Sequence, residues 1–276
     1  MRENGMGKIV TVMNFKGGVG KTTVTMNLGC DLAYTKNVLL IDLDPQFNLS
    51  QYLLNYNGYS ELLKNNVPSI YELFEEGNPN IPRRNIDDYI VHVQRYRGGK
   101  LDLIYSKLQL YYTMKLARDT TQTLYNKLAP ILDQYDVILL DCPPTMSIIS
   151  DAAFYLSDYV LIPVMPEFLC TIGLPLLYQS IQEFNNLNNF NKVSILGAVI
   201  NGIDGYAPES EMAIKDIKNM CNAYGINVFG TEIYYSRSYP KSARYGTTVR
   251  NTPYSRWDVI YNFEHFVNEF KNRAGV

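Results

Sequence analysis

The sequence predicts one α/β domain built on a doubly wound, mostly parallel sheet with helices on both faces. Short β-branched apolar runs alternate with helix-like stretches over almost all of the 276 residues. Runs such as Val137–Leu140 are continuously apolar, which is typical of parallel strands covered on both sides. No linker rich in Gly, Ser or Pro interrupts the alternation. We therefore expect a single domain over residues 1–276, with residues 1–7 frayed.

Each element follows from its local pattern. The strands expected from apolar runs are Lys8–Asn14, Val38–Asp42, Tyr89–Val93, Leu101–Tyr105, Val137–Asp141, Tyr159–Pro163, Val193–Asn201 and Val228–Tyr234. Helices over 22–35, 119–134, 147–156, 173–187 and 209–223 fit between them. Capping-box spacing from Ser69 to Glu72 predicts a short helix through Phe74.

The last predicted helix, 255–272, allows two interpretations. It places an apolar set on one face, which suits either a membrane-binding tail or a helix that closes one side of the core. Helices that lie on membranes usually carry a basic polar face. Here Asp258, Glu264 and Glu269 offset Arg256, Lys271 and Arg273, so we favour core packing and expect no membrane partner. The apolar set is Trp257, Ile260, Phe263, Val267 and Phe270.

Composition limits the function classes. The formal net charge is −2 and apolar residues make up 46%, so the chain as a whole is not a polycation and has ample material for a core. Four scattered cysteines without a C-x-x-C pair, and two distant histidines, argue against disulfides and a zinc site. The start has no apolar leader, and no apolar run is long enough for a bilayer, so a cytoplasmic location is expected.

A glycine-rich run, Lys16–Thr23, is the most informative feature. It follows an apolar strand and opens a helix, which is the context that a phosphate-binding loop requires. Backbone N–H groups there converge on phosphate oxygens, and the lysine and the first threonine suit the β/γ-phosphates and Mg²⁺. ATP and Mg²⁺ are therefore the expected cofactors. The predicted nucleotide-binding residues are Gly17, Gly18, Val19, Gly20, Lys21, Thr22 and Thr23.

This loop departs from the ordinary pattern in two places. Phe15 stands where the first glycine of G-x-x-x-x-G-K-[ST] is expected, and a second lysine, Lys16, stands beside it. The residues alone do not say whether Lys16 acts on the nucleotide or is simply a solvated lysine.

Carboxylates follow two of the apolar strands. Asp141 ends the run Val137–Leu140, and it suits either Mg²⁺ or an ordinary loop position after a buried strand. Asp42 and Asp44 end the run that begins at Val38 and, being two residues apart, share one face. One of them could orient an attacking water, or both could cap the next helix.

Taken together, these segments resemble the ParA/MinD family of deviant Walker-A P-loop NTPases, and more closely its ParA/Soj partition branch. The matching runs are Phe15–Thr23, Leu40–Asn48 and Leu140–Pro144. Weaker similarity over Leu101–Ser106 and Ile233–Val249 extends the match to nearly the full chain.

The resemblance implies roles for the site residues. Lys16 would reach the partner's nucleotide across a two-fold homodimer, and Lys21 would serve the nucleotide of its own subunit. Asp44 would position the attacking water, which makes Lys16, Lys21 and Asp44 the catalytic candidates. Thr22 would bind Mg²⁺ directly and Asp141 would hold it through a water, with Asp42 as a further metal candidate.

Two more residues are assigned to the base by the resemblance. Asn201 matches a position that hydrogen-bonds adenine in relatives. Tyr234 begins Tyr234-Tyr235-Ser236, where relatives often have Pro-Arg-Asn. Tyr234 is therefore either a stacking contact for the base or a core residue.

The stretch Tyr234–Arg256 is basic, free of acidic residues and rich in tyrosine. It suits either the phosphate backbone of DNA or a solvated loop with local tyrosine packing, and relatives use basic residues in this region. Dimerisation would double the charges, so ATP could switch DNA binding on. The predicted DNA-binding residues are Arg237, Lys241, Arg244 and Arg250.

The resemblance implies an ATPase with slow intrinsic turnover that partitions plasmid or chromosomal DNA. It would associate with the nucleoid through nonspecific DNA binding and be stimulated by a ParB-type centromere-binding protein. Because Lys16 lies so near the start, we expect no helix-turn-helix domain before the ATPase. The alternatives left open are a MinD-like membrane-positioning ATPase, a relative of nitrogenase iron protein, and a ParA-like ATPase that positions another cargo.

Overall fold

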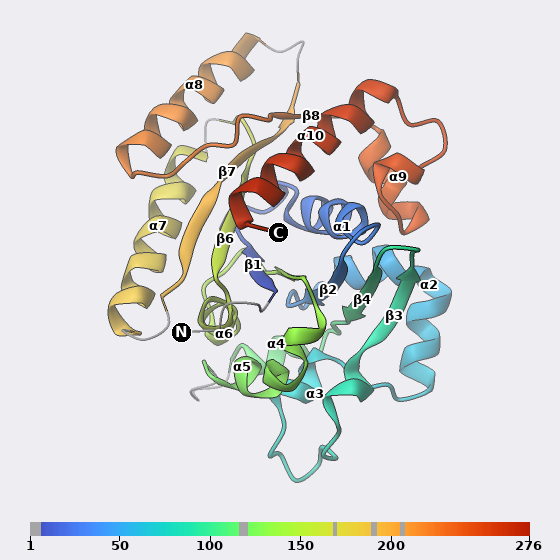
Figure 1. Ribbon diagram of the computed structural model, residues 1–276. Helices are drawn as coiled ribbons and strands as arrows, with labels where there is room; N and C mark the ends of the chain where they lie inside the picture. The colour runs from blue at the N-terminus through green and yellow to red at the C-terminus, as the bar shows by residue number, and fades with distance from the viewer. Residues whose placement is uncertain (1–6, 116–120, 168–169, 189–191, 205–207) are drawn as a thin grey trace.

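A computed structural model describes residues 7–115, 121–167, 170–188, 192–204 and 208–276. Its centre is a sheet of eight strands in the order β3-β4-β2-β5-β1-β6-β7-β8 (Figure 1). All neighbouring strands are parallel except the β3–β4 pair. This confirms the predicted doubly wound fold. The strands are β1 Lys8–Val12, β2 Asn37–Asp42, β3 Val91–Arg95, β4 Lys100–Ile104, β5 Val137–Asp141, β6 Tyr159–Val164, β7 Ser194–Ile203 and β8 Ile233–Tyr234.

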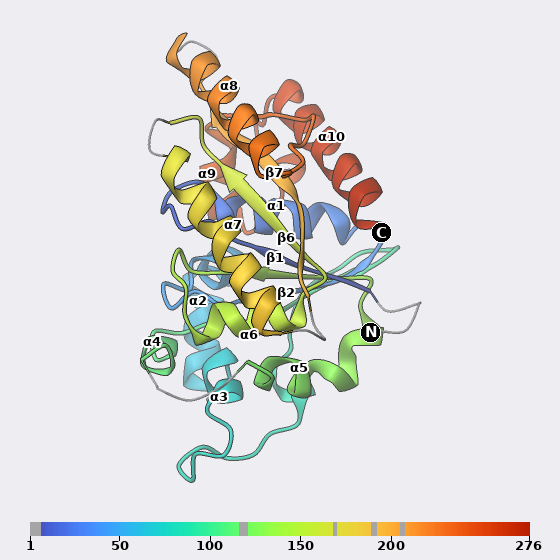
Figure 2. The same ribbon diagram turned by 90° about the vertical axis from the view of Figure 1, so that its left-hand side faces the viewer.

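Helices cover both faces of the sheet (Figure 2). One core cluster joins the sheet to α1, α2, α9 and α10, and the other joins it to α3–α8. Successive residues of β5 serve the two clusters in turn, which explains its continuous apolar run. The helices are α1 Lys21–Leu32, α2 Asn48–Lys64, α3 Ile70–Phe74, α4 Leu110–Thr113, α5 Thr123–Leu128, α6 Ile148–Leu156, α7 Cys170–Leu187, α8 Pro208–Ala223, α9 Ser238–Tyr245 and α10 Trp257–Ala274, with 3₁₀ turns at Ile86–Tyr89, Ala129–Gln134 and Val249–Asn251.

The register of the central strands sets the position of the site. Asp141 of β5 lies opposite Val12 of β1 on one side and Asp42 of β2 on the other. The carboxyl ends of these three strands therefore meet at one edge of the sheet, which we call the nucleotide edge.

Several predicted boundaries were wrong. The edge strand β3 begins at Val91 because Ile86–Tyr89 forms a 3₁₀ turn, whose Asp88 carboxylate accepts from the Asn85 N–H at 3.1 Å. The predicted strand Val228–Tyr234 is reduced to β8 and a single bridge between Val228 and Ala198. The helix predicted over 119–134 consists of α5 and the following 3₁₀ turn, and its residues 119–120 lie outside the described residues. Of the start predicted to be frayed, only Gly7 is described.

Helix α2 was not predicted at all. Its sequence contains several asparagines and a glycine, which are weak helix formers. At Asn55 the backbone leaves the helical region (φ 52°), so two helical pieces meet at a kink. Tertiary contacts therefore hold this segment helical against its local propensity.

The C-terminal helix α10 closes one side of the core, as expected. Its buried residues include Phe263, Phe266 and Phe270, all in the cluster shared with α1. Trp257, predicted to lie on the buried face, is 82% exposed because it is the first residue of the helix. Among the described helices, none has the length and apolar content needed to cross a membrane.

Candidate nucleotide site

The glycine-rich loop lies between β1 and α1 at the nucleotide edge. Gly18 and Gly20 have φ of 80° and 88°, a conformation that other residues rarely adopt. A Cβ on Gly20 would also lie 2.3 Å from the Asn201 side-chain nitrogen. That nitrogen donates to the Val19 carbonyl at 2.8 Å. Asn201, predicted from the resemblance to contact adenine, thus braces the loop from the end of β7, and its contact with the base stays a prediction.

Lys21 is turned into the loop. It is 7% exposed, and its Nζ donates to the Lys16 carbonyl at 3.1 Å. Burial lowers the pKa of Lys21, while the charges of Asp141 and Asp44 oppose that shift. A buried cation beside loop N–H groups is the arrangement that neutralises phosphate oxygens.

The carboxyl group of Asp141 is buried at this edge. Its Oδ1 lies 3.4 Å from the Thr25 hydroxyl, which itself donates to the Lys21 carbonyl at 2.9 Å. Its Oδ2 is buried and has no hydrogen-bond partner among the described residues. Burial, followed by the nearby Asp42 charge, raises the pKa of Asp141 well above its ordinary value.

These oxygens fit a magnesium ion better than a softer metal. Among the described residues, no group of three or more His, Cys, Asp or Glu side chains could hold a metal by itself. Mg²⁺ usually takes one or two protein oxygens and completes its shell with water and substrate phosphates. The buried Oδ2 of Asp141 and the hydroxyl of Thr22, in the first turn of α1, match that requirement.

Asp42 has a structural role that leaves little room for the predicted metal role. Its Oδ2 accepts from the Ser50 N–H at 2.9 Å and the Ser50 hydroxyl at 2.6 Å. Its Oδ1 accepts from the Asp44 N–H at 3.1 Å. Both oxygens are therefore used to cap α2 and to shape the turn after β2, so the metal interpretation of Asp42 has no support here. Burial raises the pKa of Asp42 to about 7.

Asp44 lies at the first turn beyond β2 and is half-buried. Its Oδ1 accepts from the Gln46 N–H at 2.9 Å, and its carbonyl accepts from the Ser106 hydroxyl at 2.9 Å. Burial raises the pKa of Asp44, and the Lys21 charge opposes that shift. Its place beside Lys21 is compatible with orienting a water, and that role stays a prediction.

The Lys16 side chain has a different partner from that of Lys21. Its Nζ forms an ion pair with Glu167, in the segment after β6, and its side chain is 21% exposed. Glu167 was missed by the sequence analysis because 151 residues separate it from Lys16. The available signal was its position a few residues beyond a predicted parallel strand, whose end must lie at the same edge.

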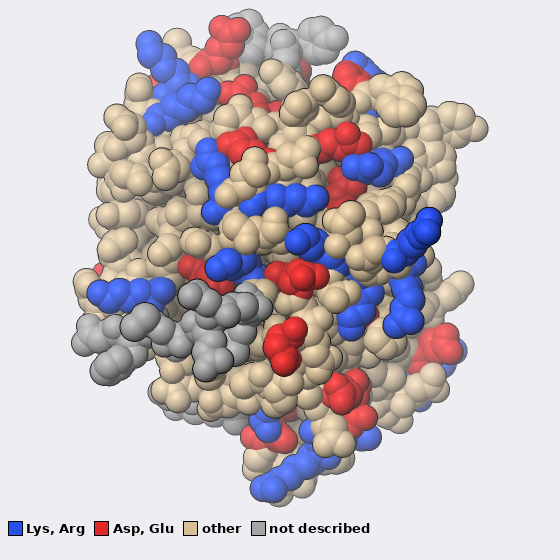
Figure 3. Space-filling model, in the orientation of Figure 1, with Lys and Arg blue, Asp and Glu red and all other residues tan. Residues whose placement is uncertain are grey.

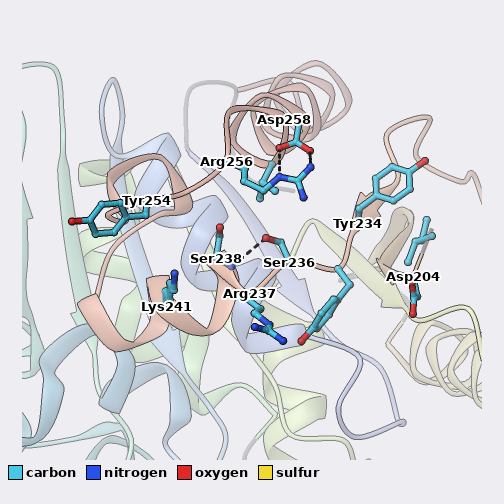
Figure 4. A pocket seen from close by; sticks show the side chains of 12 residues that line it. Asp204, Tyr234, Ser236, Arg237, Ser238, Lys241, Tyr254, Arg256 and Asp258 are labelled. Atoms are coloured by element: carbon cyan, nitrogen blue, oxygen red, sulfur yellow. Dashed lines mark hydrogen bonds and ion pairs between the residues drawn. The ribbon is translucent and has the colours of Figure 1, made fainter. Parts of the chain in front are cut away.

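The cationic side chains of the basic segment, Tyr234–Arg256, lie in two different environments. Arg237 and Lys241 line a hollow of about 640 Å³ beside Tyr234, Tyr254 and the start of α10 (Figure 4). Tyr234 is 49% exposed, so its alternative as a core residue was wrong. Arg237 is the N-cap residue of α9, and Lys241 and Arg244 follow it at i+4 and i+7 spacing; none of the three has an ion-pair partner among the described residues. We call these three residues the α9 stripe.

Arg250 differs from the α9 stripe. Its Nε lies 3.1 Å from Asp31 Oδ1 and its Nη2 lies 3.0 Å from Glu264 Oε1. Its guanidinium also lies over the Tyr34 ring, 5.3 Å from the centroid. Burial raises the pKa of Asp31 to about 6, opposed by Arg250. Because these contacts join the 3₁₀ turn Val249–Asn251 to α1 and α10, the predicted DNA role of Arg250 competes with an internal one.

Asn27 of α1 forms hydrogen bonds to two residues of the basic stretch Tyr234–Arg256. Its Oδ1 accepts from the Val249 N–H at 2.8 Å, and its Nδ2 lies 3.3 Å from the Ser242 hydroxyl. Helix α1 begins in the phosphate loop, so the loop and the basic segment are joined through one rigid helix.

Comparisons with known proteins agree with this geometry. A family model described as an AAA domain matches residues 7–194. The chain is 34% identical over 258 residues to the virulence plasmid ParA family protein pGP5-D of Chlamydia psittaci, covering 92% of this chain and 86% of that one. It is 31% identical over 232 residues to the chromosome-partitioning ATPase Soj of Treponema pallidum, covering 83% of each. A Cyanothece McdA–ATP complex matches the fold with a TM-score of 0.81 at 23% identity, covering 99% of this chain and 98% of that one.

Proposed function

The chain belongs to the ParA/Soj family of partition ATPases, and from that premise we propose that ATP-driven dimerisation switches on its binding to DNA. The dimer would bind nucleoid DNA without sequence preference. A ParB-type centromere-binding partner would stimulate hydrolysis and release the protein. The cargo would be a plasmid or a chromosome in the cytoplasm.

The site residues divide the phosphate chemistry between them. Lys21 and the loop N–H groups would bind the β- and γ-phosphates, Thr22 would bind Mg²⁺, and Asp141 would hold it through a water. When bound, Mg²⁺ supplies charge neutralisation between these phosphates. Asp44 would orient the attacking water, which is most of what a protein contributes to phosphoryl transfer.

The contrast between two lysines carries the dimer proposal. Lys21 is buried in the loop of its own subunit, whereas Lys16 lies at the rim, partly exposed and paired with Glu167. A lysine in that place can reach outward once Glu167 releases it. Delivered to a partner's nucleotide, it would act like an arginine finger in trans, effective only when two subunits meet.

Dimerisation would promote DNA binding because the dimer presents the cations of both subunits to the DNA. The α9 stripe gives each subunit three cations with no internal ion pair among the described residues. Affinity for duplex DNA depends steeply on the number of phosphates neutralised, so doubling that small number has a large effect. The membrane-positioning alternative gains no support, because α10 buries its apolar face against the core.

Binding of a labelled duplex of random sequence, measured with ATP and with ADP across a salt series, tests this proposal. Wild type should bind more tightly with ATP, and Lys16→Ala should remove that increment. Equal binding with both nucleotides would contradict an ATP switch. Gene neighbourhood is the simplest check on whether the cargo is a replicon.

A further inference from the structure

A closed ring of hydrogen bonds surrounds the backbone of Asp44. Asp42 Oδ1 accepts from the Asp44 N–H at 3.1 Å, and Asp42 Oδ2 accepts from the Ser50 hydroxyl at 2.6 Å. The Ser50 Oγ in turn accepts from the Ser106 N–H at 2.9 Å. The Ser106 hydroxyl donates to the Asp44 carbonyl at 2.9 Å and closes the ring. These bonds, which we call the Asp44 ring, join the end of β2, the first turn of α2 and the residue that follows β4 (Figure 1).

The Asp44 ring lies where the backbone hydrogen bonds of the sheet end. The Leu43 N–H still donates to the Asp141 carbonyl at 2.9 Å. The next N–H, that of Asp44, is bound by the Asp42 side chain instead of by a strand. The ring therefore fixes the chain at the first residue that the sheet itself no longer holds.

Burial makes the bonds of the Asp44 ring costly to break. In Figure 3 acidic and basic side chains are interspersed over the face drawn, where solvent can satisfy them. Asp42, Ser50 and Ser106, by contrast, are each 0% exposed. A polar group that is withdrawn from water destabilises the fold if it lacks a partner, so each of these side chains depends on the ring. We therefore expect the ring to be present whenever the domain is folded.

An aromatic pair supports the same turn. The Phe47 ring stacks on the Tyr59 ring with 5.2 Å between centroids, and the Tyr59 hydroxyl donates to the Ser106 carbonyl at 3.1 Å. The Phe47 N–H donates to the Asp44 carbonyl at 2.8 Å. Phe47 has φ of 46°, a conformation that persists in such a residue only where surrounding contacts hold it. Tyr59 therefore contacts both the turn and the residue that closes the ring.

We propose that Ser50, Ser106 and Tyr59 are positioning residues that act on ATP hydrolysis through Asp44. This inference deepens the proposed function and rests on it for the role of Asp44 in orienting the attacking water. The ring holds the Asp44 backbone, and the Gln46 N–H holds Asp44 Oδ1 at 2.9 Å. Asp44 Oδ2 has no hydrogen-bond partner in the described part of the chain, so it is available to the water.

Hydrolysis is sensitive to the position of such a carboxylate. A water that attacks in line must be held close to the phosphorus and in the right direction, and a displacement of about 1 Å can cost about 10²-fold in rate. ATP binding depends on the phosphate loop, which lies between β1 and α1 and contributes no bond to the ring. Loosening the ring should therefore slow hydrolysis and leave the affinity for ATP unchanged.

The test is a double-mutant cycle between Ser106 and Asp44 in the full chain. Ser106→Ala removes only the bond to the Asp44 carbonyl and leaves the Asp42 carboxylate with its partners. Single-turnover hydrolysis of γ-labelled ATP at saturating nucleotide gives the rate, and a fluorescent ATP analogue gives the affinity. The control is Ser180→Ala on α7, which also removes a hydroxyl that donates to a backbone carbonyl, that of Leu176 at 3.0 Å.

We expect Ser106→Ala to lower the single-turnover rate by about 10-fold to 10²-fold, with little change in affinity for the analogue. Asp44→Ala should lower the rate at least as far, and adding Ser106→Ala to it should cause no further loss, because the ring acts only through Asp44. Ser180→Ala should keep the wild-type rate. Melting temperatures establish that the variants fold. Tyr59→Phe removes only the hydroxyl bond to Ser106 and should lower the rate less, and it replaces Ser106→Ala in the cycle if that variant does not fold.

Three results would overturn the inference. The first is a wild-type rate in both Ser106→Ala and Tyr59→Phe. The second is an equal fold-reduction by Ser106→Ala with and without Asp44, which would indicate a general effect on the structure. The third is a loss of analogue affinity as large as the loss of rate, which would assign the serine to nucleotide binding.

The inference and the ATP switch of the proposed function fail separately. Ser106→Ala should keep the increase in DNA affinity that ATP produces, because it alters hydrolysis and not nucleotide binding. Absence of that increase in wild type would contradict the ATP switch and would leave the double-mutant cycle unaffected. A wild-type rate of hydrolysis in Asp44→Ala would remove the role of Asp44 and the inference with it.

Discussion

The nucleotide edge and the α9 stripe contain the same kinds of charged residue in opposite environments. At the nucleotide edge Lys21, Asp42 and Asp141 are buried, and their pKa values are displaced by burial. On α9 the cations are exposed and lack internal ion pairs among the described residues. At the nucleotide edge, desolvation therefore sets the pKa values of the charged groups. On α9, the strength of the electrostatic interactions depends instead on the salt concentration of the solvent.

Lys16→Ala should give the largest effect, because Lys16 is the lysine of the nucleotide edge that reaches the surface. ATP hydrolysis should fall by about 10³-fold or more, as for other cations delivered across an interface. Affinity for ATP should change little, since Lys21 remains. Single-turnover hydrolysis and binding of a fluorescent ATP analogue measure the two quantities.

A matched control for that variant is Lys218→Ala, which removes another lysine paired with a glutamate, Glu232, away from the loop. Its hydrolysis rate should equal that of wild type. Normal hydrolysis in Lys16→Ala would contradict a role in trans.

Asp141→Asn tests how much the buried carboxylate at the nucleotide edge lowers the free energy of unfolding. Without nucleotide, and at a pH above the raised pKa of Asp141, the variant should be more stable than wild type by about 1–3 kcal/mol, because it keeps neutral a buried side chain whose Oδ2 has no hydrogen-bond partner among the described residues. The gain in stability that wild type obtains from Mg²⁺ and ADP should disappear. Thermal unfolding with and without Mg·ADP measures both, and the control is Asp133→Asn, at an exposed carboxylate without an ion pair among the described residues. A variant that is less stable and still responds to Mg²⁺ would contradict the assignment.

Asp31→Asn removes a buried carboxylate of α1 that forms an ion pair with Arg250 of the basic stretch Tyr234–Arg256. Burial raises the pKa of Asp31 to about 6, above the value of about 3.9 for an unfolded chain. The folded state therefore binds the extra proton between these values, and wild-type stability should fall as pH rises through that window, by up to about 1.4 kcal/mol per pH unit. The variant lacks this dependence. Urea unfolding at several pH values measures the difference, and parallel curves for both proteins would refute it.

Arg244→Ala should have the smallest effect on the fold. Unfolding free energy should stay within about 0.5 kcal/mol of wild type, since the side chain is exposed and has no ion pair within the described chain. The slope of log K for DNA binding against log salt, measured with ATP, should fall by about 0.9 for each phosphate that is no longer neutralised.

Arg250→Ala should show the opposite pattern. It should lower the free energy of unfolding and leave the salt slope of DNA binding unchanged, because Arg250 forms ion pairs with Asp31 and Glu264. Identical behaviour of the two variants would remove the distinction between them.

The central strands were predictable because burial on both faces leaves a continuous apolar run. The bounds of β5 were predicted correctly, and the run ending at Asp42 identified the end of β2. The phosphate loop was predictable for a similar reason, since its glycines and lysine stand next to one another in the sequence.

Features made by distant residues could not be predicted in this way. The partner of Lys16 lies 151 residues away, and the partner Asp31 of Arg250 lies 219 residues away. Helix α2 was missed because its stability comes from contacts such as Ser50 with Asp42 instead of from local propensity. A single sequence shows which residues carry charge, and only the packed chain shows which charges are already used.

The strand order also has a consequence for synthesis of the chain. The central strand β1 pairs only with β5 and β6, so its first partner is made about 130 residues later. At about 5–20 residues per second, roughly 6–26 s pass before that partner exists. During this time an apolar strand and the helix that follows it wait without a sheet, and we expect a ribosome-bound chaperone to occupy them until β5 is made.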